Sequence, residues 1–128
     1  MKKILSVAIV ALTMVFLSSC GGGGSYQYEQ GDPMPSINAS KGTVNGHSYD
    51  TSKNCCWKVT FNYTIQSNGS KTKGSEVTYE WGTEFEIVSV HEMAMWTYAQ
   101  AGKYAAASYS YVKTSESTYE DCVNRNKE

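Results

Sequence analysis

The chain has 128 residues, of which 41% are hydrophobic and 18% are charged, and its formal net charge is −1 at pH 7. This length suits one domain rather than two. With 11 basic residues against 12 acidic ones and no basic run, the composition argues against a nucleic-acid partner, which would need a positively charged surface.

The N-terminal residues have the layout of a secretory signal. Lys2 and Lys3 precede an apolar run from Ile4 to Leu17, and a charged segment followed by an apolar one is the pattern of a signal peptide. The run is shorter than the roughly 18 apolar residues that a membrane-spanning helix needs. We therefore predict that residues 1–19 are a signal peptide.

The end of this segment resembles the lipobox of bacterial lipoproteins, over residues 1–20 only. Leu17, Ser18 and Ser19 directly precede Cys20, as at the cleavage site of lipoprotein signal peptidase. The resemblance implies that Cys20 is the first mature residue and carries a diacylglycerol and a further acyl chain such as palmitate. Two or more acyl chains anchor a protein stably to a membrane. Gly21 rather than Asp follows the cysteine, which by the same resemblance favours the outer membrane.

Residues 20–40 have the composition of a flexible tether behind the lipidated cysteine. Gly21–Ser25 is a Gly/Ser run, and the following segment lacks periodicity and contains Pro33 and Pro35. Such segments bury too little apolar surface to fold by themselves. We expect a single domain in residues 41–128.

Alternating side chains predict a β-hairpin in the first half of this domain. Asn45-Gly46 is a strong signal for a first, short hairpin. A longer strand follows, in which polar residues alternate with five apolar ones, Trp57, Val59, Phe61, Tyr63 and Ile65. This period of two indicates a half-buried antiparallel strand. After a polar turn over residues 66–75, the alternation resumes at Val77–Trp81.

A helix is predicted from about residue 84 to 101. On a helical wheel, apolar residues of this stretch occupy one half and most polar ones the other. Gly102 would be the C-cap glycine. Because Ser89 and Glu92 form a second capping-box pattern besides Thr83 and Glu86, a longer strand followed by a helix starting near residue 90 is the alternative.

The last elements are a strand and a short helix. Tyr104–Lys113 reads as a strand with Tyr109 and Tyr111 on one face, and the Ser117…Glu120 pattern predicts a helix over about 118–125. Together, the elements predict an α+β fold in which a small antiparallel sheet, a β-hairpin plus a further strand, is packed by one long helix.

Three cysteines remain when Cys20 is acylated, and a disulfide is expected in an oxidising compartment. Cys55 has the same strand parity as Trp57, so a terminal helix packing on that apolar face would meet it. We predict a Cys55–Cys122 disulfide. Cys56 would then be free, paired between molecules, or joined to Cys55 as a vicinal disulfide.

Three apolar residues on the polar half of the predicted helix are the partner-binding candidates: Phe85, Trp96 and Met93. If they are exposed, they form an aromatic stripe of the kind that marks interaction surfaces. The alternative is that the N-terminal segment or the terminal helix covers them.

Catalytic and metal-binding signals are weak, so we expect no enzyme activity, no cofactor and no metal. His91 and Met95 lie one helical turn apart, but the helical arrangement argues for core packing rather than a copper site. His47 and Asp50 lie near Cys55 and Cys56 without a zinc-ligand spacing. No G-x-S-x-G motif occurs.

These observations predict a membrane-anchored interaction module that binds another envelope protein or a glycan. An inhibitor or immunity-type lipoprotein that acts on a hydrolase or a toxin is the alternative, because it would have the same anchor and a similar disulfide-bonded scaffold. An enzyme or a metal carrier ranks below both.

Overall fold

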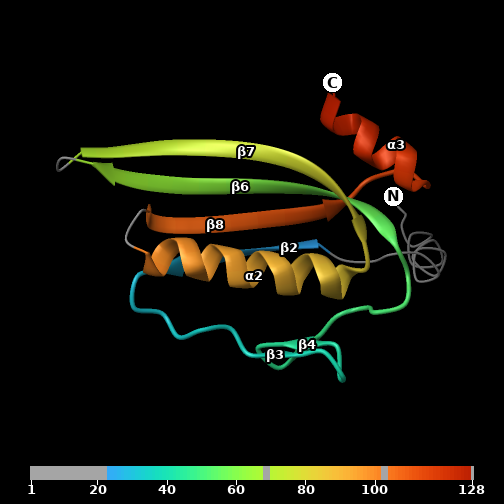
Figure 1. The fold of residues 1–128 in the computed structure, drawn as a ribbon, viewed down its shortest axis with the longest axis horizontal. Coiled ribbons are helices and arrows are strands. Elements are labelled where there is room, and N and C mark those ends of the chain that lie inside the picture. Colours follow the sequence, from blue (N-terminus) through green and yellow to red (C-terminus); the bar gives the residue numbers. More distant parts are fainter. Residues whose placement is uncertain (1–22, 68–69, 102–103, 128) are drawn as a thin grey trace, which may run out of the picture.

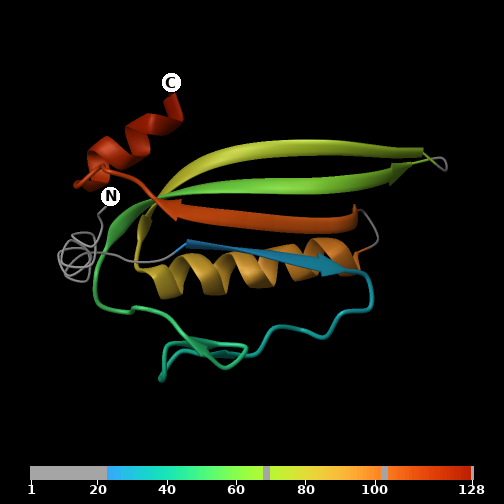
Figure 2. The same ribbon diagram turned by 180° about the vertical axis from the view of Figure 1, so that it is seen from behind.

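A computed structural model describes residues 23–67, 70–101 and 104–127. The fold is α+β, as predicted, with a four-stranded antiparallel sheet in the order β2-β8-β6-β7. One long helix, α2, packs mainly on β8 and β2 and covers one face of the sheet (Figures 1 and 2). The elements of this layer are β2 (Gly23–Glu29), β6 (Cys55–Ser67), β7 (Ser70–Gly82), α2 (Glu84–Gln100) and β8 (Tyr104–Lys113).

A second, small sheet lies beside α2 and is formed by three two-residue strands: β3 (Ile37–Asn38), β4 (Thr43–Val44) and β5 (His47–Ser48). Asn45 and Gly46 connect β4 to β5 with φ values of 51° and 83°. Two consecutive positive φ angles define the turn that Asn-Gly favours, so this predicted hairpin is confirmed.

The long hairpin of β6 and β7 is also confirmed, and it supplies the sheet side of the core. Trp57 and Val59 are fully buried under α2, against buried residues of the helix such as Val88 and Met95. The indole nitrogen of Trp57 donates a hydrogen bond of 2.9 Å to the carbonyl of Gly82. The alternating pattern therefore identified the buried face correctly.

The start of α2 is fixed by the first of the two capping boxes. The Thr83 hydroxyl accepts a hydrogen bond from the Glu86 amide, and the Glu86 carboxylate accepts one from the Thr83 amide. These bonds satisfy amides that a helix N-terminus leaves unpaired. The later start near residue 90 is therefore wrong. The helix has Ala101 as its C-cap, and Gly102 lies outside the described residues.

The predicted tether is wrong from Gly23 onward, because β2 is an ordered edge strand. Its seven residues pair with β8, and Tyr26 lies opposite Tyr109. Tyr26 and Tyr28 point to the core side while Gln27 and Glu29 are exposed. This short alternation was hidden by the glycines before it and the prolines after it.

The predicted Cys55–Cys122 disulfide is wrong, because Cys56 bonds Cys122 with an S–S distance of 2.07 Å and a Cα–Cα distance of 5.5 Å. Helix α2 already covers the face of Trp57. The terminal helix α3 (Tyr119–Asn124), followed by the 3₁₀ helix η1 (Arg125–Lys127), packs on β6 and β7 where the opposite-parity Cys56 points. No cysteine of the described residues is a free thiol.

The terminal helix itself was predicted, but its cap was not. Thr118, rather than Ser117, is the N-cap, and its hydroxyl accepts from the Asp121 amide at 3.1 Å. Neither α2 nor α3, the α-helices of the described ranges, is long and apolar enough to span a bilayer.

Candidate functional site

A buried carboxylate lies between α2 and the sheet. Glu92 is only 2% exposed, and its carboxylate accepts hydrogen bonds from the phenols of Tyr28 and Tyr109, the latter at 2.6 Å. The side-chain amide of Asn45 lies 3.5 Å from the same carboxylate. Buried charge is tolerated when it is hydrogen-bonded, so Glu92 joins α2, β2, β8 and the small sheet at one point.

The tyrosines around this carboxylate stay protonated over a wide pH range. Burial, and then the hydrogen bond to Glu92, raises the pKa of Tyr28 and of Tyr109 above the ordinary value. Burial and the bond of 2.9 Å to Glu84 act in the same way on the pKa of Tyr111. These phenols therefore serve as neutral hydrogen-bond donors that fix α2 against the sheet.

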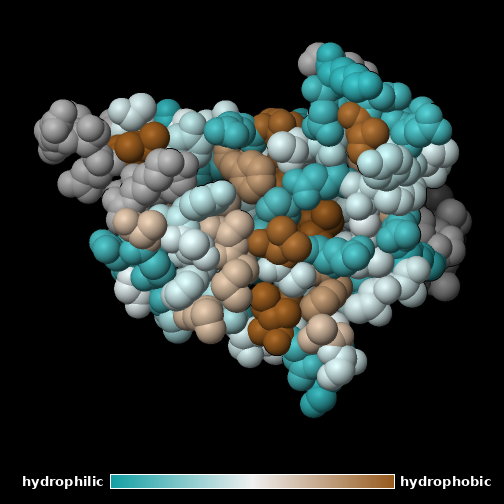
Figure 3. All heavy atoms as spheres, in the orientation of Figure 1, coloured by the Kyte–Doolittle hydropathy of each residue, from teal (hydrophilic) through white to brown (hydrophobic). Residues whose placement is uncertain are grey.

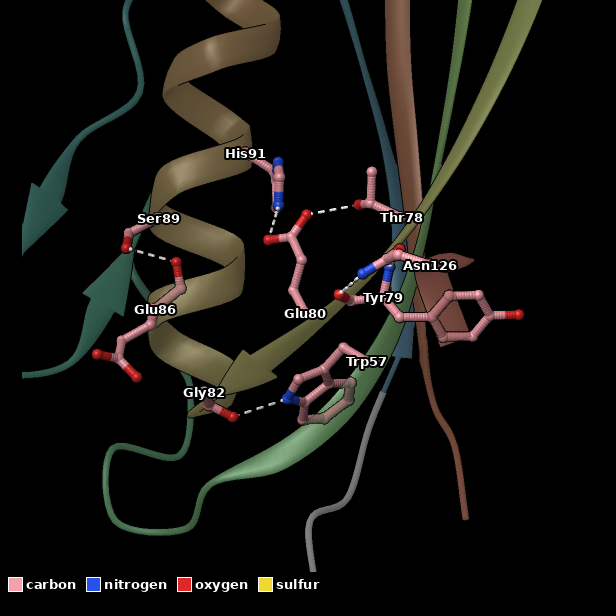
Figure 4. Close-up of polar contacts among 9 residues, drawn as sticks. All are labelled: Trp57, Thr78, Tyr79, Glu80, Gly82, Glu86, Ser89, His91 and Asn126. Carbon is pink, nitrogen blue, oxygen red and sulfur yellow. Dashed lines mark hydrogen bonds and ion pairs between the residues drawn. The ribbon is translucent and has the colours of Figure 1, made fainter. Parts of the chain in front are cut away.

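His91 is held by an acid from the sheet (Figure 4). Its Nε2 lies 2.8 Å from Oε1 of Glu80, and the Thr78 hydroxyl donates to Oε2 at 2.7 Å. Burial works to raise the pKa of Glu80, but the hydrogen bonds from His91 and Thr78 outweigh it, so the pKa is lowered. The His91 ring also packs edge-on against Phe61.

The possible metal ligands identified in the sequence are not brought together. Met95 is a buried core residue, and Glu80 engages His91. His47 is exposed on β5. The Asp50 carboxylate accepts from the amides of Ser52 and Lys53. Within the described residues, no group of three or more metal-ligating side chains occurs.

The aromatic stripe predicted from Phe85, Trp96 and Met93 is not a fully exposed surface. All three are half-buried, and Phe85 and Trp96 pack against the core. The Trp96 indole donates to the carbonyl of Asp32 at 2.8 Å, and the Phe85 amide donates to that of Asp50. The segment that leads from β2 to β6 therefore contacts Phe85 and Trp96, and the contact of Trp96 is with the N-terminal segment, as in the alternative.

A groove of about 330 Å³ opens instead along the other flank of α2, next to the β6–β7 hairpin. Val90 and Tyr98 of α2 are 60% and 45% exposed there. Hydrophobic side chains gather in the middle of this side of the molecule (Figure 3). The lining is mostly aromatic and aliphatic, and its chief residues are Phe61, Tyr63, Glu76, Val90, Met95 and Tyr98.

A glycine allows Tyr63 to form the wall of this groove. Tyr63 pairs with Gly74 across β6 and β7, and its ring lies over the glycine so closely that a Cβ there would come within 2.1 Å of the ring. A glycine in a strand often marks such a close approach. The groove could not be predicted from the sequence, because its walls come from separate elements.

No protein-family model, curated protein or solved structure matches this chain. The groove and the N-terminal motif are therefore the features from which its function is inferred.

Proposed function

We propose that the protein is a lipid-anchored lipoprotein of the bacterial cell envelope, on the outer membrane, whose domain is a non-enzymatic interaction module. The anchor is proposed from Cys20 and the residues before it. The partner is another envelope protein or a glycan.

The groove between α2 and the β6–β7 hairpin is the observation that carries the binding role. Its volume, about 330 Å³, is at the lower end of the range for ligand sites. It would hold a few side chains or a sugar unit. Aromatic side chains such as Phe61, Tyr63 and Tyr98 offer flat contact surface to either partner.

His91 lines the groove, and its engagement by a neighbouring acid favours a binding role over a catalytic one. Glu80 and His91 bind each other, while Glu84 and Glu92 accept hydrogen bonds from tyrosines. These bonds connect α2, which forms one side of the groove, to β7 and β8. Preformed walls reduce the entropy lost on binding.

The test is affinity capture from envelope extract with a soluble, oxidised form of residues 21–128, which keeps all of β2. Val90→Lys places a charge in the groove at a residue that is 60% exposed, so the fold should persist. Val112→Lys is the matched control, because Val112 is 52% exposed and points to the face of the sheet opposite α2.

We expect Val90→Lys to weaken capture of the partner by at least about tenfold, or about 1.4 kcal/mol, and Val112→Lys to have little effect. If both variants retain the partner as the wild type does, the groove is not the binding site. If the captured partner is a hydrolase or a toxin that the protein inactivates, the inhibitor or immunity-type role replaces the general one.

A further inference from the structure

Strand β7 lies at one edge of the four-stranded sheet. In an antiparallel sheet, the amide and carbonyl groups of alternate residues of an edge strand point away from the neighbouring strand. Such unpaired groups form a template on which another strand can pair. The outer side of β7 is therefore a potential interaction surface.

One position on this edge already holds a peptide-like group (Figure 4). The side-chain amide of Asn126, in η1, accepts from the Tyr79 backbone N–H at 2.7 Å and donates to the Tyr79 carbonyl at 2.9 Å. An added strand would make the same pair of bonds. Asn126 thus shows that the backbone N–H and C=O of Tyr79 point away from β6 and that an amide group can bind both of them.

The outward direction repeats every second residue, so Val77, Ser75 and Lys73 share the orientation of Tyr79. The regular β6–β7 register supports this, since it contains no bulge. Helix α3 and η1 lie at the Tyr79 end of the sheet, and the hairpin projects away from them (Figure 1). Among the described residues, we find no group bonded to the outward backbone of these three residues.

We propose that the edge from Lys73 to Val77 binds an extended segment of a partner protein, which adds to the sheet as a fifth strand next to β7. This site extends beyond the groove and shares Glu76 with it. Backbone hydrogen bonds supply the affinity in such strand addition, and alternating side chains supply the specificity.

The side chains beside the edge define the segment that would fit. Glu76 points to the α2 side of the sheet and belongs to neither of the ion pairs within the described ranges, so a basic residue suits the position opposite it. Val77, on the other face, is 47% exposed and favours an apolar neighbour. Lys73, on the same face as Val77, favours an acidic one. Cross-strand pairs of this kind add selectivity.

The experiment measures amide hydrogen exchange of the oxidised mature chain with two capped peptides. For antiparallel pairing, Val-Arg-Thr-Thr-Glu matches the edge, and Val-Glu-Thr-Thr-Arg is its charge-reversed control. We expect the matched peptide at saturation to slow exchange of the Lys73, Ser75 and Val77 amides by about tenfold. The Glu76 amide, which faces β6, is the internal reference and should not change.

Ser75→Pro removes one outward N–H and inserts a ring at a position where an edge strand tolerates proline. It should abolish the protection of Lys73 and Val77, while Ser75→Thr should keep it. If Ser75→Pro does not fold, Glu76→Lys replaces it and should abolish the preference between the two peptides, because each peptide then makes one opposite-charge and one like-charge pair with residues 73 and 76.

Several outcomes would overturn this proposal. Equal exchange with and without both peptides would do so, as would uniform slowing that includes Glu76. Protection that appears without peptide and rises with protein concentration would make a second copy of the chain the occupant instead. Because Val90 lies outside this edge, loss of groove binding alone leaves the expected protection intact.

Discussion

The side chain of Glu92 connects several elements. Its buried carboxylate accepts from tyrosines on β2 and β8, so removing it would leave two phenol groups without an acceptor. An unsatisfied buried donor costs about 1–3 kcal/mol. We expect Glu92→Leu to lower the free energy of unfolding by about 3 kcal/mol, measured by urea denaturation with the disulfides intact.

Glu92→Gln is the matched variant, because it keeps the shape of the side chain and one acceptor oxygen. It should cost roughly half as much as Glu92→Leu. Combining Glu92→Leu with Tyr109→Phe should cost less than the sum of the two single changes, since the phenol that loses its acceptor is then gone. Strict additivity in this cycle would show that the bond contributes nothing to stability.

At the scale of elements, the hydrogen bond between Glu80 and His91 connects β7 to α2, and Glu80 makes the stability depend on pH. The lowered pKa of Glu80 means that the unfolded state takes up a proton more readily than the folded state. The stabilisation is therefore fully present above the ordinary pKa of 4.5 and is lost as pH falls below it toward the folded pKa.

We expect Glu80→Gln to reduce the loss of stability on acidification from about pH 5 to 3, measured from urea midpoints. Thr78→Val removes only one of the two hydrogen bonds to the carboxylate. Its loss of stability between about pH 5 and 3 should lie between those of the wild type and Glu80→Gln. Asp50 and Glu116, whose pKa values are also lowered, contribute to the pH dependence of stability equally in the wild type and in both variants. An unchanged slope in Glu80→Gln would refute the role of the pair.

The elements that could be predicted from the sequence are those fixed by local chemistry. The Asn45-Gly46 turn, the alternation around Trp57 and the capping box at Thr83 each depend on a few neighbouring residues. Glu92 was missed because the helical wheel placed it among the polar residues, and its two tyrosine partners lie on other strands. Which acid is buried is a property of packing that periodicity does not report.

The errors in the disulfide and the tether have the same nonlocal origin. Strand parity placed Cys55 and Cys56 on opposite faces correctly, but only the three-dimensional structure shows which face receives α3. A helix as short as α3 is not stable in isolation. The Cys56–Cys122 bond closes a loop with a sequence separation of 66, which stabilises the fold by about 4 kcal/mol in the chain-entropy model.

At the scale of the whole molecule, strand β2 determines the distance and the orientation that a lipid-anchored domain would have relative to the membrane. Gly23 lies only three residues after Cys20, a distance of about 10 Å at full extension. Gly23 pairs with Val112 at the end of the sheet opposite the β6–β7 turn. A lipid on Cys20 would therefore hold the domain close to the bilayer and direct the hairpin edge away from it.

This orientation requires the lipid anchor, and the anchor exists only if Cys20 is acylated. We expect mass spectrometry to show that the mature N-terminal peptide begins at Cys20 and carries acyl chains. Each buried methylene of these chains contributes about 0.8 kcal/mol to membrane binding. Cys20→Ser should therefore release the protein from membranes. One sulfur cannot form both a thioether and a disulfide. An unacylated Cys20 recovered in a disulfide-linked peptide with Cys55 would therefore exclude the anchor and leave a secreted domain.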